Sequence, residues 1–201
     1  MSQHAPTECN VCYLSTGVDH GADRGDVWTV LIVRVPSEPS RHRVAVWREL
    51  RRVGAVQLGQ GSWALPEAPP FDGFIDKIVA LVGQHEGEVM ALRSAAADEA
   101  TAQRIRGLYD SARRAEWVEF VSECGKCLAE LEKEIRNEKF TLAELDEEEQ
   151  NVDRLRRWHR ELRSRDVFDS VDEAEIMARL DACTTELERF TALVYNAVGL
   201  D

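Results

Sequence analysis

Apolar positions follow two different periods along this chain, and the change of period near residue 98 divides it. Between residues 26 and 98, four short segments predict β-strands, because they are rich in β-branched residues or flank a glycine-rich hairpin turn. These segments are Val27–Val35, Ala55–Leu58, Ser62–Leu65 and Glu88–Ser94. Two segments with apolar residues every three or four positions predict helices, at Arg41–Val53 and Phe71–Val82. The order strand-helix-strand-strand-helix-strand is that of a ferredoxin-like module.

The first predicted helix has recognisable ends and one expected buried stripe. Ser40 is a favourable N-cap residue, and Gly54 is a favourable stop. We expect the buried stripe to consist of four apolar residues at a spacing of three: Val44, Trp47, Leu50 and Val53. The arginines of this segment would then occupy mostly the other faces of the helix.

After Asp98 the pattern is helical throughout. Three apolar stripes follow one another, and their members are Trp117, Phe120, Val121, Cys124, Leu128, Leu131 and Ile135; Leu142, Leu145, Val152, Leu155 and Leu162; and Ile176, Leu180, Cys183, Leu187, Phe190 and Val194. Amphipathic helices of this kind form an antiparallel bundle or cover a sheet. We therefore predict an α+β protein with a flexible tail at residues 1–25, a ferredoxin-like βαββαβ module at 26–98 and an α-helical bundle domain at 99–201.

Composition narrows the class of protein. The chain has 201 residues, 44% of them hydrophobic, and a formal net charge of −12 that falls mostly after residue 98. No apolar run is long enough to span a bilayer, and the first residues lack a secretory signal, so we expect a cytoplasmic protein with reduced thiols and no membrane partner. The overall acidity disfavours non-specific nucleic-acid binding.

A local basic cluster stands out against this acidity. It consists of Arg34, Arg41, Arg43, Arg48 and Arg52, with Arg51 beside them. Such a cluster at a helix start could bind the phosphates of DNA, or it could hold a small oxyanion dianion with the help of the helix dipole. The alternative is a solvated helix face whose arginines pair with acidic residues.

Two C-x-x-C pairs suggest metal or redox chemistry. Cys9 with Cys12 and Cys124 with Cys127 could together supply four thiolates to zinc. Cys124 also belongs to an apolar stripe, as does Cys183, and core packing is the better explanation of that position. The pair in the tail could instead be a redox or metal-sensing element.

Carboxylates of the helical half suggest a second metal hypothesis. Glu134, Glu148 and His159 fall toward the apolar stripes, and inward carboxylates with a histidine between helices can hold iron or manganese. The Glu-x-x-His pairs that such di-metal sites use are absent, and a solvated acidic face explains the same residues. No cofactor is predicted from the pattern.

Several stretches resemble a known family. The run RVPSEPSRHRVAVWRELRRVGAVQLGQGSWALP, at 34–66, resembles the N-terminal domain of ChrB-type chromate resistance proteins. Further matches are EKFTLAELDEEE at Glu138–Glu149, RLRRWHRELRSRDVF at Arg154–Phe168 and ELERF at Glu186–Phe190. The resemblance implies chromate-responsive control of an efflux operon, a role in association with DNA and sensing of an oxyanion.

Two departures from related families limit what is carried over. ChrB-type proteins usually continue into a second domain, whereas this sequence ends at Asp201, so we expect any chromate chemistry of that domain to be absent. The module is also similar, more distantly, to PaaX-type repressors and to ferredoxin-fold nucleases associated with CRISPR. Those nucleases place an aspartate where this chain has Arg34-Val35-Pro36, so no nuclease activity is expected.

The functional expectation is a ChrB-like transcription regulator of a stress response. It would bind DNA as a homodimer through the basic helix and would respond to chromate or a related oxyanion. An alternative is a metal-dependent enzyme or accessory protein that uses the inward carboxylates or the cysteines, although the residues favour a non-enzyme. The other alternative is a protein–protein interaction module built on the acidic helices.

Overall fold

The structure is a computed structural model that describes residues 14–15 and 27–199. Its elements in the first half are β1 (Leu14–Ser15), β2 (Val27–Arg34), α1 (Ser40–Val53), β3 (Val56–Gly59), β4 (Ser62–Pro66), α2 (Phe74–Gly83) and β5 (Glu88–Ala95), with a 3-10 turn at Pro69–Phe71. Three helices complete the chain: α3 (Glu99–Arg136), α4 (Leu142–Arg165) and α5 (Glu173–Val198). The predicted α+β class is confirmed.

One sheet holds all the strands, in the order β1-β5-β2-β4-β3. The four strands from β5 to β3 are antiparallel, and their order is that of the predicted ferredoxin-like module. Strand β1 adds to the β5 edge in parallel, with Leu14 opposite Leu92. Residues 14–15 thus form a strand where a tail was predicted, and the rest of that segment lies outside the described residues.

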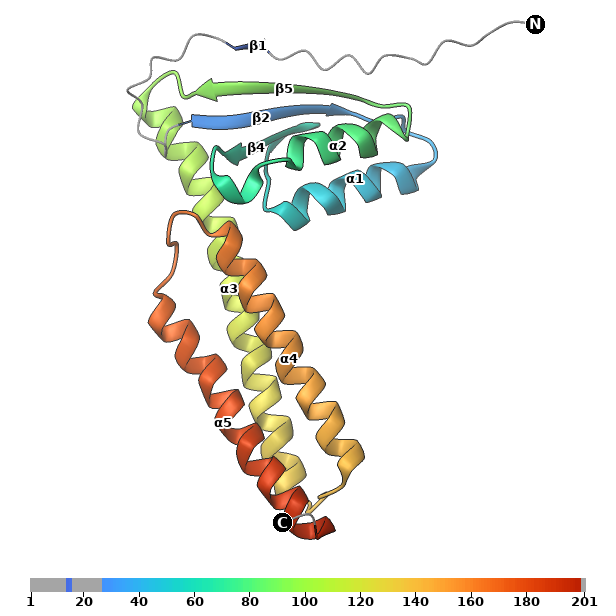
Figure 1. Ribbon diagram of the computed structural model, residues 1–201. Coiled ribbons are helices and arrows are strands. Elements are labelled where there is room, and N and C mark those ends of the chain that lie inside the picture. Colours follow the sequence, from blue (N-terminus) through green and yellow to red (C-terminus); the bar gives the residue numbers. More distant parts are fainter. Residues whose placement is uncertain (1–13, 16–26, 200–201) are drawn as a thin grey trace, which may run out of the picture. The chain divides into compact units, whose positions relative to one another are not determined.

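The pleat of β2 sends alternate side chains to two different layers. Leu31 lies opposite Trp63 of β4 and Ala91 of β5, and all three are buried on the face that carries α1 and α2 (Figure 1). Trp28 faces the other way and meets the ring of Tyr109 edge-on, with 5.7 Å between ring centroids. This second contact buries one end of the open sheet face.

Helix α1 forms where expected, but its buried face and its cap differ from the prediction. Val46 and Leu50 are buried, whereas Val44 and Trp47 are 43% and 49% exposed. A strict spacing of three drifts by about 60° per step around a helix of 3.6 residues per turn, so the predicted stripe winds half-way round the helix. The N-cap residue is Pro39, without a side-chain cap, so the expectation for Ser40 was wrong.

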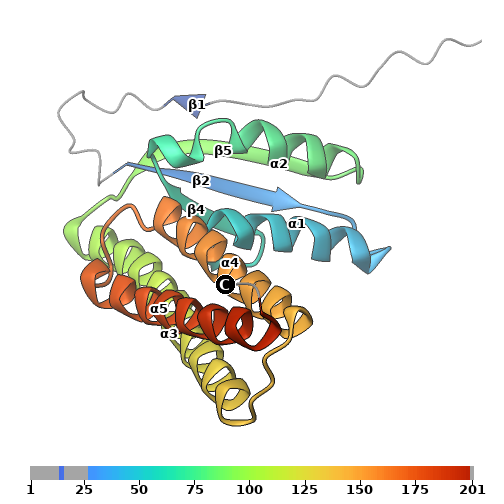
Figure 2. The same ribbon diagram turned by 60° about the horizontal axis from the view of Figure 1, so that its bottom comes forward.

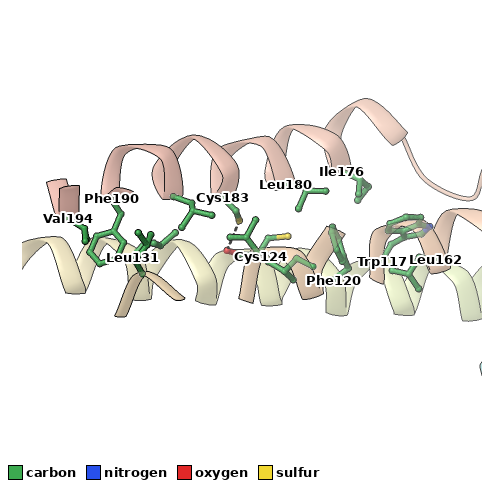
Figure 3. Packing of buried hydrophobic residues seen from close by; sticks show 14 residues of the cluster. Trp117, Phe120, Cys124, Leu131, Leu162, Ile176, Leu180, Cys183, Phe190 and Val194 are labelled. Atoms are coloured by element: carbon green, nitrogen blue, oxygen red, sulfur yellow. Dashed lines mark hydrogen bonds between the residues drawn. The ribbon is translucent and has the colours of Figure 1, made fainter. Parts of the chain in front are cut away.

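Two compact units make up the chain, the first ending at Tyr109 and the second beginning at Asp110. In the second unit α3, α4 and α5 run side by side as a bundle (Figure 1, Figure 2). Thr141 and Asp172 cap α4 and α5 by accepting hydrogen bonds from the backbone N–H groups of Glu144 and Ala174. The three predicted apolar stripes meet in the bundle core, as Figure 3 shows, apart from Leu142, which begins α4 and is 47% exposed.

Within the part of the chain that the structure describes, no helix combines the length and the apolarity needed to cross a membrane.

Candidate functional site

The exposed side of α1 gathers four arginines on one face. We call this the arginine face, and its members are Arg41, Arg48, Arg51 and Arg52, with Val44 among them and Trp47 at the border. Residues at intervals of three, four and seven share one side of a helix, which is why these positions coincide. The arginine face points away from Val46 and Leu50, the residues that attach α1 to the sheet.

Two contacts organise the arginine face. Arg52 donates two hydrogen bonds to the Glu49 carboxylate, at 2.6 and 2.8 Å, and this pairing holds the pKa of Glu49 below its usual value. The guanidinium carbon of Arg51 lies 5.6 Å from the centre of the Trp47 ring, a cation–π contact. Arg41 and Arg48 have no acidic partner among the described residues. The arginine face is therefore basic and retains donors for an external anion.

The other two arginines of the predicted cluster lie elsewhere. Arg43 is exposed but is two positions from Arg41, which places it about 200° around the helix. Arg34 ends β2 opposite Glu88 and shares the sheet face of Trp28, not the face that carries α1. The structure thus brings together Arg41, Arg48, Arg51 and Arg52 and leaves Arg34 and Arg43 apart from them.

The amino end of α1 is also electropositive. Its first turn contains no acidic residue and its N-cap makes no side-chain hydrogen bond. His42 stacks on His85 with ring centroids 3.9 Å apart, and desolvation, followed by His85 and Arg41, lowers the pKa of His42. A neutral imidazole together with free N–H donors and Arg41 makes this end suited to an anion.

Those residues proposed for metal binding that the structure describes do not converge on one site. Cys9 and Cys12 lie outside the described residues, and Cys124 and Cys127 belong to the bundle core. Among residues 14–15 and 27–199, no group of three or more histidine, cysteine, aspartate or glutamate side chains is placed to hold a metal ion.

Glu134 has a structural partner. Its carboxylate pairs with the ammonium of Lys139 at 3.0 Å and with that of Lys133 at 3.6 Å. The hydrogen bond from Lys139 is the main reason that the pKa of Glu134 is lowered. This pairing ties the end of α3 to the segment that leads into α4.

His159 of α4 packs against aromatic residues of α3. Its ring lies 5.5 Å from the Trp117 ring and 5.7 Å from the Phe120 ring, measured between centroids. Burial lowers the pKa of His159, which keeps the imidazole neutral at a position surrounded by aromatic rings.

Glu148 is a buried carboxyl of α4, and the side chain of Asn151 donates a long hydrogen bond of 3.4 Å to it. Burial raises the pKa of Glu148, and the nearby acids Glu130, Glu147 and Glu134 raise it further. A buried carboxyl of this kind destabilises the fold when it is ionised.

We therefore expect Glu148→Gln to stabilise the bundle at neutral pH. Because the pKa of Glu148 is higher in the folded state than in the unfolded state, its protonated form favours folding, and this contribution is lost as pH rises above the ordinary value of 4.5. The gain in unfolding free energy over the wild-type chain should accordingly grow from about pH 4 to pH 7 in urea titrations. Glu147→Gln removes an exposed neighbour and is the control. If the unfolding free energies of Glu148→Gln and Glu147→Gln depended on pH in the same way, the raised pKa of Glu148 would be contradicted.

Two arrangements in the bundle escaped the sequence pattern. The Cys183 sulfur of α5 lies 3.4 Å from the backbone oxygen of Cys124 on α3, although its stripe predicts only that it is buried. Asp166 is buried at the end of α4 and accepts a hydrogen bond of 2.8 Å from the indole N–H of Trp117. Positions 117 and 166 are far apart in sequence, and no local signal connects them.

Comparisons with known proteins agree on one family. Residues 43–200 match the model of the family described as Protein ChrB, N-terminal. Protein ChrB of Cupriavidus metallidurans is 29% identical over 104 residues, which cover 51% of this chain and 32% of the relative. The matched part thus spans about a third of that relative's length. No solved structure matches the chain.

Proposed function

The chain belongs to the ChrB N-terminal family, and on that premise we propose that it is a cytoplasmic regulatory protein that binds DNA and responds to chromate or a related oxyanion stress. The observation that carries the proposal is the arginine face of α1. It is a basic and partly apolar surface on a chain whose formal net charge is −12.

The chemistry of this face suits the DNA backbone. Guanidinium groups donate parallel hydrogen bonds to phosphate oxygens, and each phosphate that is neutralised releases bound counterions. Trp47 and Val44 add exposed apolar surface beside these charges, which can pack on deoxyribose. Within the described chain, Glu49 is the one acidic residue of α1, and it is already paired with Arg52.

The amino end of α1 supports the oxyanion part of the proposal. A dianion bound there by Arg41 and backbone N–H groups would occupy the same electropositive end that phosphate uses. Chromate would then displace DNA by competition. A homodimer would present two such helices to a two-fold symmetric operator.

Arg48→Ala combined with Arg51→Ala should weaken binding to the DNA upstream of the protein's own gene. Two lost phosphate contacts should lower affinity by roughly tenfold and reduce the slope of log affinity against log salt by about 2. Fluorescence anisotropy over a salt series measures both, and a stoichiometry of two chains per operator supports the homodimer.

The matched control for this experiment is Arg157→Ala with Arg160→Ala. These are two exposed arginines of α4 at the same spacing of three, so the variant loses the same charge. If both double variants lost the same DNA affinity, the loss would come from the change in net charge alone, and the assignment of DNA binding to α1 would be overturned. Adding chromate to the wild-type complex tests the response, with sodium chloride at equal ionic strength as the reference.

A further inference from the structure

A cavity of about 430 Å³ lies in the first unit, between the sheet and the segment that leads from β4 into α2. Thr29 of β2 and Leu65 of β4 are opposite each other on its sheet side, with Ala91 of β5 nearby. Phe71 of the 3-10 turn and Ile75 of α2 line it from the helix side. We call this space the sheet cavity, and its volume is that of a site for a small organic molecule.

The interior of the sheet cavity is mostly apolar. Leu65, Phe71 and Ala91 are buried, and Ile75 is half-buried beside them. An apolar group that enters the cavity exchanges water for contact with these side chains, which favours binding in proportion to the apolar area removed from water. The interior therefore suits an aromatic or branched aliphatic group.

Opposite charges meet at the rim of the sheet cavity. The Nε–H group of Arg93 donates a hydrogen bond of 2.6 Å to a carboxylate oxygen of Glu67, and both side chains are about half exposed. This bond uses one of the five N–H donors of the guanidinium and one of the two oxygens of the carboxylate. Asp72, which is exposed, adds a second carboxylate to the lining. The rim thus offers cationic donors and anionic acceptors side by side.

This mixture of charges favours a ligand that carries both signs. A ligand with a carboxylate alone would bring that group near Glu67 and Asp72, and a ligand with an ammonium alone would bring it near Arg93. An α-amino acid carries both groups on one carbon atom. Its carboxylate can accept hydrogen bonds from the guanidinium while its ammonium donates to the Glu67 carboxylate. Its side chain then points away from the charged groups and can enter the apolar interior.

We propose that the sheet cavity binds an apolar α-amino acid, with the charged groups on Arg93 and Glu67 and the side chain between the sheet and Phe71. The cavity combines the required volume, an apolar interior and a rim of both charges in one place. Helix α1 contributes no residue to its lining. The proposal therefore stands or falls separately from DNA binding by the arginine face.

Amide chemical shifts of the nitrogen-15-labelled full chain, followed during titration with L-phenylalanine or L-leucine, test the proposal. We expect saturable shifts confined to the lining of the sheet cavity, in β2, β4, β5 and residues 66–75. The compounds 3-phenylpropionate and 2-phenylethylamine, each of which lacks one charged group of phenylalanine, should bind about tenfold more weakly or worse. Equal binding of either analogue would contradict recognition of both charges. No saturable shift with either amino acid up to about 10 mM would overturn the proposal.

Two variants test the charged rim. Arg93→Gln and Glu67→Gln should each weaken the binding of the amino acid by about tenfold or more. Because the pair is half exposed, both variants should stay folded, which circular dichroism checks. Arg189→Gln is the matched control, since Arg189 of α5 forms a similar exposed pair with Glu186 at 2.8 Å. Unchanged affinity in both rim variants, or shifts centred outside the lining of the cavity, would place the amino acid elsewhere and overturn the assignment.

Discussion

Replacing Asp166 with alanine should destabilise the helical unit by about 3 kcal/mol or more, because the buried indole N–H of Trp117 and two part-buried donors of Ser170 lose their acceptor at once. The carboxylate accepts a hydrogen bond of 2.8 Å from the indole N–H of Trp117 on α3. It also accepts hydrogen bonds of 3.0 and 2.8 Å from the backbone N–H and the hydroxyl of Ser170. These bonds fix the turn between α4 and α5 to α3. Without the carboxylate, the indole N–H stays in the core without a partner.

Urea unfolding followed by circular dichroism measures this loss, and the slope of the transition should stay unchanged. Asp169→Asn is the matched control in the same turn, since Asp169 is 75% exposed and pairs at the surface with Arg163 at 3.0 Å, and asparagine tolerates its φ of 51°. Exposed ion pairs contribute up to about 1 kcal/mol, so the control should stay near the wild-type chain. Equal stability of the two variants would show that the buried network does not hold the turn.

The regular elements of the first half are encoded locally. The β-branched run of β2 and the Gly59-Gln60-Gly61 turn between β3 and β4 each predict their structure from neighbouring residues alone. The ferredoxin-like strand order then follows from the order of elements and their right-handed connections. This explains why the pattern predicted the sheet, apart from β1, whose two residues carry no strand signal.

The buried face of α1 was not predictable from a spacing of three residues. The predicted stripe ran through Val44, Trp47 and Leu50, of which only Leu50 is buried, and Val46 joins Leu50 on the buried face. Val46 and Leu50 stay on one side of the helix because residues four apart drift by only about 40°, whereas each step of three drifts by about 60° in the other direction. Choosing the wrong stripe assigned Trp47 to the core, and it hid the contact that Trp47 makes with Arg51.

Contacts between helices of the bundle depend on axial register, which no single helix encodes. The stripes show correctly that Cys124 and Cys183 are buried, but they leave open which residue of α5 meets which residue of α3. The pairing of Trp117 with Asp166 has the same origin, since it depends on where α4 ends relative to α3. Both contacts therefore became visible only in three dimensions.

The aromatic centre of the bundle should be equally sensitive to truncation. Phe120 is fully buried, and its ring meets the rings of Trp117 and Trp158 edge-on, with centroids 5.8 and 5.5 Å apart. Phe120→Ala should cost about 4 kcal/mol of unfolding free energy, since it loses the apolar transfer energy, leaves a cavity and removes two favourable ring contacts. The rings around Phe120 come from both α3 and α4, so the cavity would loosen the packing between these two helices.

Val118→Ala on the same helix tests whether this cost arises from packing or from a change in α3 itself. Val118 is 70% exposed and lies two positions from Phe120, so the substitution shortens a side chain without opening a cavity. Alanine also has the higher helix propensity, so this control should be neutral or slightly stabilising in the same urea titration. If both substitutions lowered the unfolding free energy equally, the loss would come from a weaker α3 helix and not from the packing around Phe120. A large loss confined to Phe120 places it in the shared core that also holds His159 neutral.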